Sequence, residues 1–213
     1  MDDGIGSPDY IIGGKVLPEG KRPYLASLGR KDEHECGATL IHPNVVLTAA
    51  DCVTNENNGN FSPLDWIDFK RYDLTSGLAG VDRRNLSRTE GKGPNYVQRH
   101  PEYVDRDQGN DFATICLEQP VEDITPVQLN SDRKIPVDGS TLEAFGWGYT
   151  SPNGDDYPNL PRTADLTYLT NKEVQKPPYD VDVAPATSPT KMFTIDPKQS
   201  ICEGDYGKNR LLL

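Results

Sequence analysis

Short runs of apolar and polar residues alternate along the first two-thirds of the chain, and turn-forming residues separate them. Residues 66–72 alternate with a period of two, which is typical of a strand with one buried face. The apolar runs 38–41 and 45–48 flank a His-Pro-Asn turn and predict two neighbouring strands. Further strand candidates are residues 23–28, 95–100, 111–117, 141–148 and 164–169. No segment sustains a helical period for three turns, so the pattern predicts an all-β fold.

The two ends and one central stretch differ from this pattern. Residues 1–10 are small, acidic and turn-rich, and we interpret them as a leader or propeptide-like segment. Residues 121–138 carry several prolines and have the composition of a connection between two units. Disorder is the competing interpretation for residues 174–200, which are rich in proline and polar residues.

Composition excludes several classes of function. The 213 residues include 22 Lys and Arg against 33 Asp and Glu, which gives a formal charge of −11. An acidic chain lacks the basic face that nucleic acids and anionic lipid surfaces require, so neither is an expected partner. No apolar run approaches the roughly 20 residues of a membrane span, and no signal peptide is visible at the start. No cofactor is indicated.

Two short motifs favour a secreted protein, whereas the cysteines leave their own pairing open. Cys36, Cys52, Cys116 and Cys202 allow three pairings, and none forms the C-x-x-C spacing of a zinc or redox site, so no metal is expected. The triplets that begin at Asn60 and Asn85 are N-glycosylation sequons, although Pro63 follows the first.

Five motifs, in order along residues 11 to about 207, resemble the trypsin-like serine protease family. They are Ile11-Ile12-Gly13-Gly14, the segments Cys36 to Ile41 and Val46 to Cys52, Asn110-Asp111-Phe112-Ala113, Gly146-Trp147-Gly148, and Cys202 to Gly207. The resemblance implies two packed antiparallel six-stranded β-barrels with the active cleft between them. We expect the first barrel in residues 11–120 and the second in residues 121–213, incomplete at its C-terminus because the chain stops soon after the nucleophile loop.

Two of the three catalytic positions that the resemblance identifies carry the wrong chemistry. The family's histidine precedes the cysteine of the Ala-Ala-x-Cys motif, and here Asp51 stands there. A carboxylate with a pKa of about 4 is a poor base for a hydroxyl and cannot shuttle its proton as imidazole does. Tyr206 replaces the serine nucleophile, whereas Asp111 keeps the aspartate position. Two neighbouring acids predict that one has a raised pKa. The histidines His34, His42 and His100 lie outside the motif.

The rest of the implied site is altered as well. Backbone amides of Gly204 and Asp205 would form the oxyanion loop, but Lys208 stands where the family has glycine. Ser200 occupies the base of the specificity pocket, where trypsin-like members carry an acid, so preference for Lys or Arg substrates is not supported. Ile11 and Asp205 match the activation pair, although Tyr10 precedes the bond that activation would cut.

The resemblance also assigns the cysteines. Cys36 and Cys52 match the bridge beside the histidine loop, and we expect that pair. The family partner of Cys202 would lie in a tail beyond Leu213, and Cys116 has no family role, so these two either pair with each other or stay free.

The leading hypothesis is a catalytically inactive homologue that is secreted and acts by binding a protein. Secreted homologues with broken triads include the glucanase inhibitor proteins of plant pathogens, so the expected partner is an extracellular hydrolase such as a host endo-β-1,3-glucanase. One alternative is an endopeptidase with a non-standard triad. Another is a truncated gene product without function.

Overall fold

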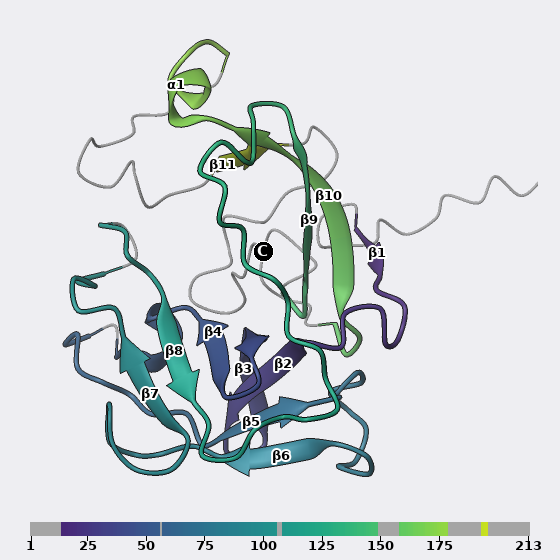
Figure 1. Ribbon diagram of the computed structural model, residues 1–213, viewed down its shortest axis with the longest axis vertical. Helices are drawn as coiled ribbons and strands as arrows, with labels where there is room; N and C mark the ends of the chain where they lie inside the picture. Colours follow the sequence, from purple (N-terminus) through teal and green to yellow (C-terminus); the bar gives the residue numbers. More distant parts are fainter. Residues whose placement is uncertain (1–13, 56, 106–107, 149–157, 179–192, 196–213) are drawn as a thin grey trace, which may run out of the picture.

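The computed structural model describes residues 14–55, 57–105, 108–148, 158–178 and 193–195 (Figure 1). Within these ranges almost all regular structure is antiparallel β-strand, arranged in two sheets, and the one α-helix has four residues. The all-β prediction is therefore confirmed. No helix in these ranges has the length and apolar character that a membrane crossing needs.

Among the residues that the structure describes, the first sheet contains seven strands in the order β6-β5-β2-β3-β4-β8-β7. Their bounds are β2 (Leu25–Arg30), β3 (Glu33–His42), β4 (Val45–Thr48), β5 (Trp66–Phe69), β6 (Asp82–Asn85), β7 (Tyr96–Arg99) and β8 (Ala113–Cys116). The resemblance implied six strands. The strand without a sequence signal is β6, whose Asp-Arg-Arg-Asn sequence has no apolar alternation but pairs with β5 along its whole length.

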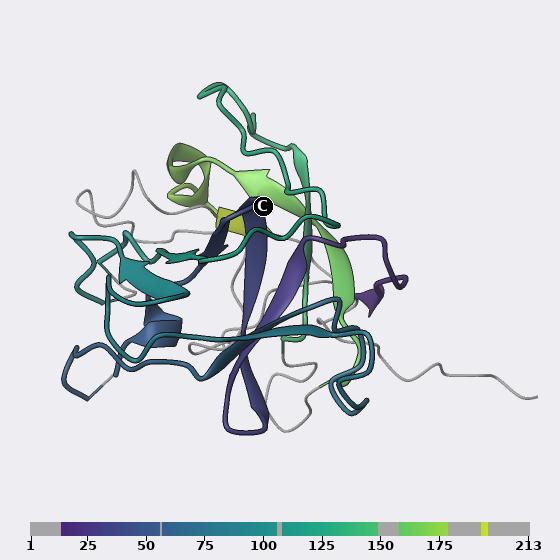
Figure 2. The same cartoon turned by 60° about the horizontal axis from the view of Figure 1, so that its bottom comes forward.

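The two edges of the first sheet meet and close it toward a barrel (Figures 1 and 2). The Asn95 side chain, just before β7, donates through Nδ2 to the Asn85 carbonyl at the end of β6, at 2.9 Å. The Ser87 backbone N–H donates to the Asn95 carbonyl at 3.1 Å. These bonds satisfy backbone groups that an open edge would leave exposed.

Aliphatic and aromatic side chains fill the first barrel. Leu28, Leu40, Ile67, Phe69 and Ile115 are all completely buried in one cluster. Burying each such side chain contributes on the order of 1.5–3 kcal/mol to stability.

The prediction of one buried face for residues 66–72 is wrong in one respect. Ile67 and Phe69 face the core, as the alternation requires, but Trp66 and Asp68 on the opposite face are buried too. The reason is that Arg71 and Arg83 fold over that outer face and contact both of these side chains.

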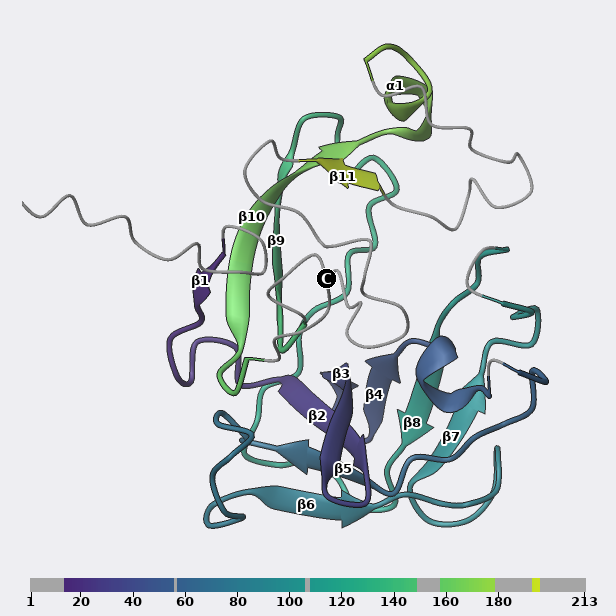
Figure 3. The same cartoon turned by 180° about the vertical axis from the view of Figure 1, so that it is seen from behind.

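The second sheet has four strands within the described residues, and β10 is its centre (Figure 3). β10 (Arg162–Leu169) pairs with β1 (Lys15–Val16), β9 (Thr141–Gly146) and β11 (Phe193–Ile195). β1 belongs to the range expected for the first barrel but pairs within the second sheet. Helix α1 (Asn171–Val174) follows β10, and the Thr170 side chain caps it by accepting the Glu173 N–H.

A separate hydrophobic cluster joins the two sheets. Leu17, Leu25, Phe145 and the fully buried Trp147 pack together. Trp147 donates through Nε1 to the Tyr72 carbonyl at 3.2 Å, so the tryptophan of the Gly-Trp-Gly motif is a core residue that ties the sheets together.

Candidate functional site

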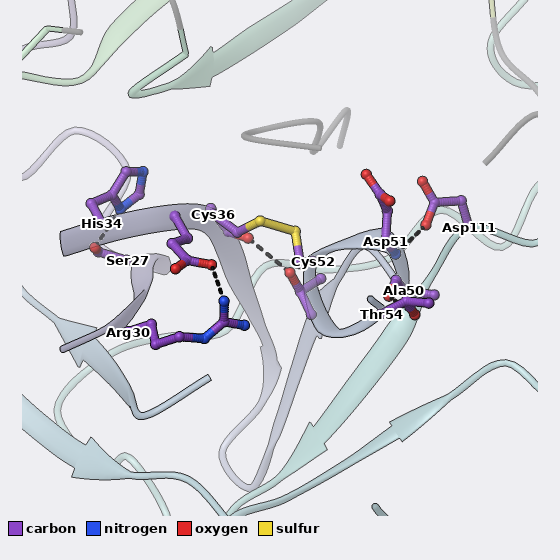
Figure 4. Close-up of a disulfide and its surroundings, with 12 residues drawn as sticks. Ser27, Arg30, His34, Cys36, Ala50, Asp51, Cys52, Thr54 and Asp111 are labelled. Carbon is purple, nitrogen blue, oxygen red and sulfur yellow. Dashed lines mark hydrogen bonds and ion pairs between the residues drawn. A yellow bond between two sulfur atoms is a disulfide. The ribbon is translucent and has the colours of Figure 1, made fainter. Parts of the chain in front are cut away.

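A short turn after β4 carries the residue that replaces the expected histidine. Asp51 begins the 3-10 turn η1 (Asp51–Val53), directly after Ala49 and Ala50, which are both buried. Cys52 of this turn forms a disulfide with Cys36 of β3, with 6.2 Å between their Cα atoms (Figure 4). The predicted bridge is therefore confirmed, and it attaches the turn to the sheet.

The fold brings Asp51 and Asp111 together, as the sequence predicted. Asp111 lies just before β8, which pairs with β4, so both residues lie at the same end of these neighbouring strands. The backbone N–H of Asp51 donates to Oδ1 of Asp111 at 2.8 Å, and Figure 4 shows the two side chains next to each other. Both residues are half-buried. The raised pKa expected for one of them stays a prediction.

The backbone at position 51 thus places a side chain next to Asp111, and that side chain is the carboxylate of Asp51. An imidazole, which the family's reaction uses to take and return the proton, is absent from this pair of carboxyl groups. The described residues contain no cluster of three or more His, Cys, Asp or Glu side chains suited to a metal ion.

Several predicted site residues lie outside the described residues. They are Ile11, Ser200, Cys202, Gly204, Asp205 and Tyr206, and their assignments as activation pair, pocket base, disulfide partner, oxyanion loop and nucleophile position stay predictions.

Two of the three histidines have local structural roles. The ring Nδ1 of His42 accepts the Asn44 N–H at 3.2 Å, and that of His100 accepts the Glu102 N–H at 3.2 Å. His100 also packs against Phe112, with 4.5 Å between ring centroids and 52° between the ring planes. Neither ring has a hydroxyl nucleophile among its described partners.

The third histidine forms a pair that local sequence patterns do not predict. His34 Nδ1 lies 2.7 Å from the hydroxyl of Ser27 on the neighbouring strand β2 (Figure 4), and its ring packs against Trp147 at 5.3 Å. The register shift between Leu28 and Gly29 in the β2–β3 pairing sets the two side chains beside each other. Ser27 is completely buried, so a peptide carbonyl cannot reach its oxygen.

The remaining predicted positions are the two sequon asparagines and Cys116. Asn60 and Asn85 are both exposed, as a glycosylated asparagine must be, and whether they carry sugar stays a prediction. Cys116 is half-buried on β8 and forms no disulfide with any described residue.

Comparison with known proteins supports one family. The trypsin family model matches residues 11–208. Trypsin II-P29 of Gallus gallus is 29% identical over 93% of this chain and 73% of its own length. Snake venom serine proteinase 4a of Crotalus adamanteus is 31% identical over 94% of this chain and 72% of its own length.

Solved structures agree at the level of the fold. Human heparin binding protein superposes with a TM-score of 0.61 at 23% identity, over 76% of this chain and 67% of that one. Neuropsin, a serine protease expressed in mouse brain, gives a TM-score of 0.62 at 19% identity, over 79% of this chain and 70% of that one.

Proposed function

The chain belongs to the trypsin family, and we propose that it is a member that does not hydrolyse peptide bonds and acts by binding another protein. The observation that carries this proposal is the identity of the residue beside Asp111. Asp51 stands where the family's reaction needs an imidazole, and its backbone holds it in hydrogen-bonding contact with Asp111.

The chemistry explains why this substitution removes the reaction. A serine hydroxyl attacks a peptide carbonyl only while a base accepts its proton, and the same base must return that proton to the leaving amine. A carboxylate with an ordinary pKa of about 4 is too weak a base to accept the hydroxyl proton efficiently near neutral pH, and in its ionised form it has no proton to return. Tyr206 at the nucleophile position would add a second defect, because a phenol is larger and more rigid than a serine side chain.

The proposed partner is an extracellular hydrolase, such as a host endo-β-1,3-glucanase, and the protein would act as its inhibitor. The family's typical secretion, the disulfide and the exposed sequon asparagines support an extracellular site of action. The formal charge of −11 favours association with a basic surface, because long-range attraction steers encounter.

Active-site labelling tests the loss of catalysis. The folded protein, incubated with a fluorophosphonate probe, is expected to take up no label, since no hydroxyl is activated. Trypsin serves as the positive control. Labelling of any serine, located by peptide mass spectrometry, would overturn the proposal.

An endopeptidase with a non-standard triad is the competing function, and Ser27 with His34 is the one hydroxyl–imidazole pair that the described residues offer. The burial of Ser27 argues against it. Any hydrolysis of a peptide substrate that disappears in Ser27→Ala would favour this competing function.

Binding is tested separately by retention of proteins from an extracellular fluid on the immobilised folded chain. The expected result is a saturable partner that heat-unfolded protein does not retain. Retention of nothing by the folded chain, across fluids that contain glucanases, would count against the proposal.

A further inference from the structure

The segment that leads into the first barrel lies along the second sheet; we call residues 14–22 the strap. Its strand β1 pairs with β10, and the Leu17 backbone N–H donates to the Pro161 carbonyl at 2.8 Å. Strand β2 of the first sheet begins at Leu25, so the strap leads from one sheet to the other (Figure 3). Leu17 is buried in the same cluster as Trp147. The strap therefore helps to join the two sheets.

One carboxylate of β9 binds the end of the strap nearest to β2. Oε1 of Glu143 accepts Nζ of Lys21 at 3.2 Å, and Oε2 pairs with Nη2 of Arg22. The Thr163 hydroxyl, on the neighbouring strand β10, donates to Oε1 at 2.9 Å. The Glu143 side chain is 22% exposed. A single carboxylate thus links two cations of the strap to two strands of the second sheet.

The position of the Arg22 side chain depends on this carboxylate. Its guanidinium lies 5.7 Å from the ring centroid of Phe145, and its Nε is buried and has no hydrogen-bond acceptor among the described residues. The charged groups that these residues place around Glu143 are Lys21 and Arg22 from the strap and Asp165, its exposed register partner on β10. Loss of the negative charge on Glu143 would leave a partly buried cation without its counter-ion, which is destabilising.

We propose that Glu143 is a pH-sensitive attachment point for the strap: its ionised form holds the strap on the second sheet, and its protonation releases the strap while the first barrel stays folded. The hydrophobic cluster that fills the first barrel includes no residue of the strap, so its packing does not depend on this attachment. The proposal is independent of the proposed binding function.

The contacts of Glu143 favour its ionised form. Burial raises the pKa of Glu143, but hydrogen bonds from Arg22, Thr163 and Lys21 outweigh burial and hold the pKa below its ordinary value. A carboxyl group with a lowered folded-state pKa stabilises the fold above its unfolded pKa of about 4.3, and this stabilisation disappears as the pH falls through the folded value. We therefore expect the strap to be held at neutral pH and released below about pH 4.

Hydrogen exchange at single backbone amides tests the release. The reporter is the Leu17 amide, and the internal control is the Asp65 amide, which donates to the Gly29 carbonyl of the first barrel at 2.8 Å. Between about pH 7 and pH 3, the protection factor of Leu17 is expected to fall about tenfold more than that of Asp65. An equal loss of protection at both amides would overturn the proposal, because the two sheets would then open together.

Two substitutions test whether Glu143 is the group responsible. Glu143→Gln keeps the shape of the side chain but cannot ionise, so Leu17 should lose about tenfold protection already at neutral pH and show no further selective loss on acidification. Asp165→Asn removes the same charge from the neighbouring strand and should not speed exchange at Leu17.

Retained protection at Asp65 shows that each variant is folded. If Glu143→Gln leaves Leu17 protected at neutral pH, or follows the same pH profile as the unmodified chain, Glu143 does not control the strap. If the Glu143→Gln variant does not fold, the pH profile of the unmodified chain still decides whether the strap is released before the first barrel unfolds.

Discussion

Asp68 and Asp111 are two aspartates of the first barrel that interact with their surroundings in different ways. The Asp68 side chain is completely buried and receives Arg83 Nε and Nη2 at 2.7 and 2.8 Å and Arg71 Nη1 at 2.7 Å. Hydrogen bonding to Asp68 also raises the pKa of Arg83 above its ordinary value, although burial opposes the shift. Asp68 thus stabilises the fold through charged side chains.

Asp111 is half-buried, and its bond to residue 51 goes to a backbone N–H rather than to a side chain. Every residue except proline provides this donor, so the bond persists whichever side chain stands at position 51. If position 51 is the family's histidine position, as predicted, the comparison explains how an aspartate there is compatible with the fold. A contact made through the backbone tolerates substitution, whereas the side-chain cluster around Asp68 does not.

We expect the largest loss of stability from substitution of Asp68. Asp68→Asn leaves two arginines beside a buried neutral group, and removing one partner of a buried charge cluster costs about 3–5 kcal/mol of unfolding free energy. Asp51→Asn, the matched substitution at the site, should cost less than about 1 kcal/mol because the N–H to Asp111 is retained. Urea unfolding measures both. Equal losses in the two variants would remove the distinction between the two aspartates.

Loss of the disulfide should cause the second largest decrease in the free energy of unfolding. Replacing Cys36 and Cys52 together by serine opens a loop whose ends are 16 positions apart in sequence. The expected loss is about 3 kcal/mol, and hydrogen exchange should rise most in residues 51–54. If exchange rises equally throughout β5 and β6, the bridge stabilises the whole barrel rather than the turn at the site.

Substitution of Asp111 should destabilise the fold by a smaller amount. Asp111→Ala leaves the Asp51 N–H without its acceptor, which costs about 1–3 kcal/mol. Asp111→Asn keeps a carbonyl oxygen at that place and should recover most of the loss. Thermal unfolding of the two variants gives the comparison, and an equally destabilised Asn variant would show that the negative charge matters rather than the hydrogen bond.

The smallest expected effect is on how stability depends on pH. The hydrogen bond from Arg99 lowers the pKa of Glu90 below its ordinary value, although burial opposes the shift. A carboxyl group with a lowered folded-state pKa stabilises the fold above its unfolded pKa of about 4.3, and this contribution disappears as the pH falls through the folded value. Glu90→Gln should therefore reduce stability at neutral pH and show a flatter decline on acidification. Parallel curves for the two proteins between about pH 6 and 2 would contradict this.

Much of the fold and part of the site could be predicted from local sequence. The runs 45–48, 141–148 and 164–169 correspond to β4, β9 and β10, because alternating apolar residues form strands wherever one face is buried. β6 was missed, since its charged residues form a strand only because β5 offers it hydrogen bonds. The pair of Ser27 and His34 was missed for a similar reason, because a strand register brings the two together.

The sequence by itself determined which side chains the motif positions carry: Asp51 stands at the position that the resemblance assigns to the family's histidine, and Cys52 beside it was predicted to pair with Cys36. These properties belong to individual residues at fixed motif positions, so no coordinates are needed to read them. Only the tertiary structure decided that Asp51 meets Asp111 through its backbone, that Ser27 is completely buried, and that Arg99 donates to the Thr54 hydroxyl and the Gly59 carbonyl. Each of these depends on strand pairing and burial between segments far apart in the chain, which local patterns do not encode.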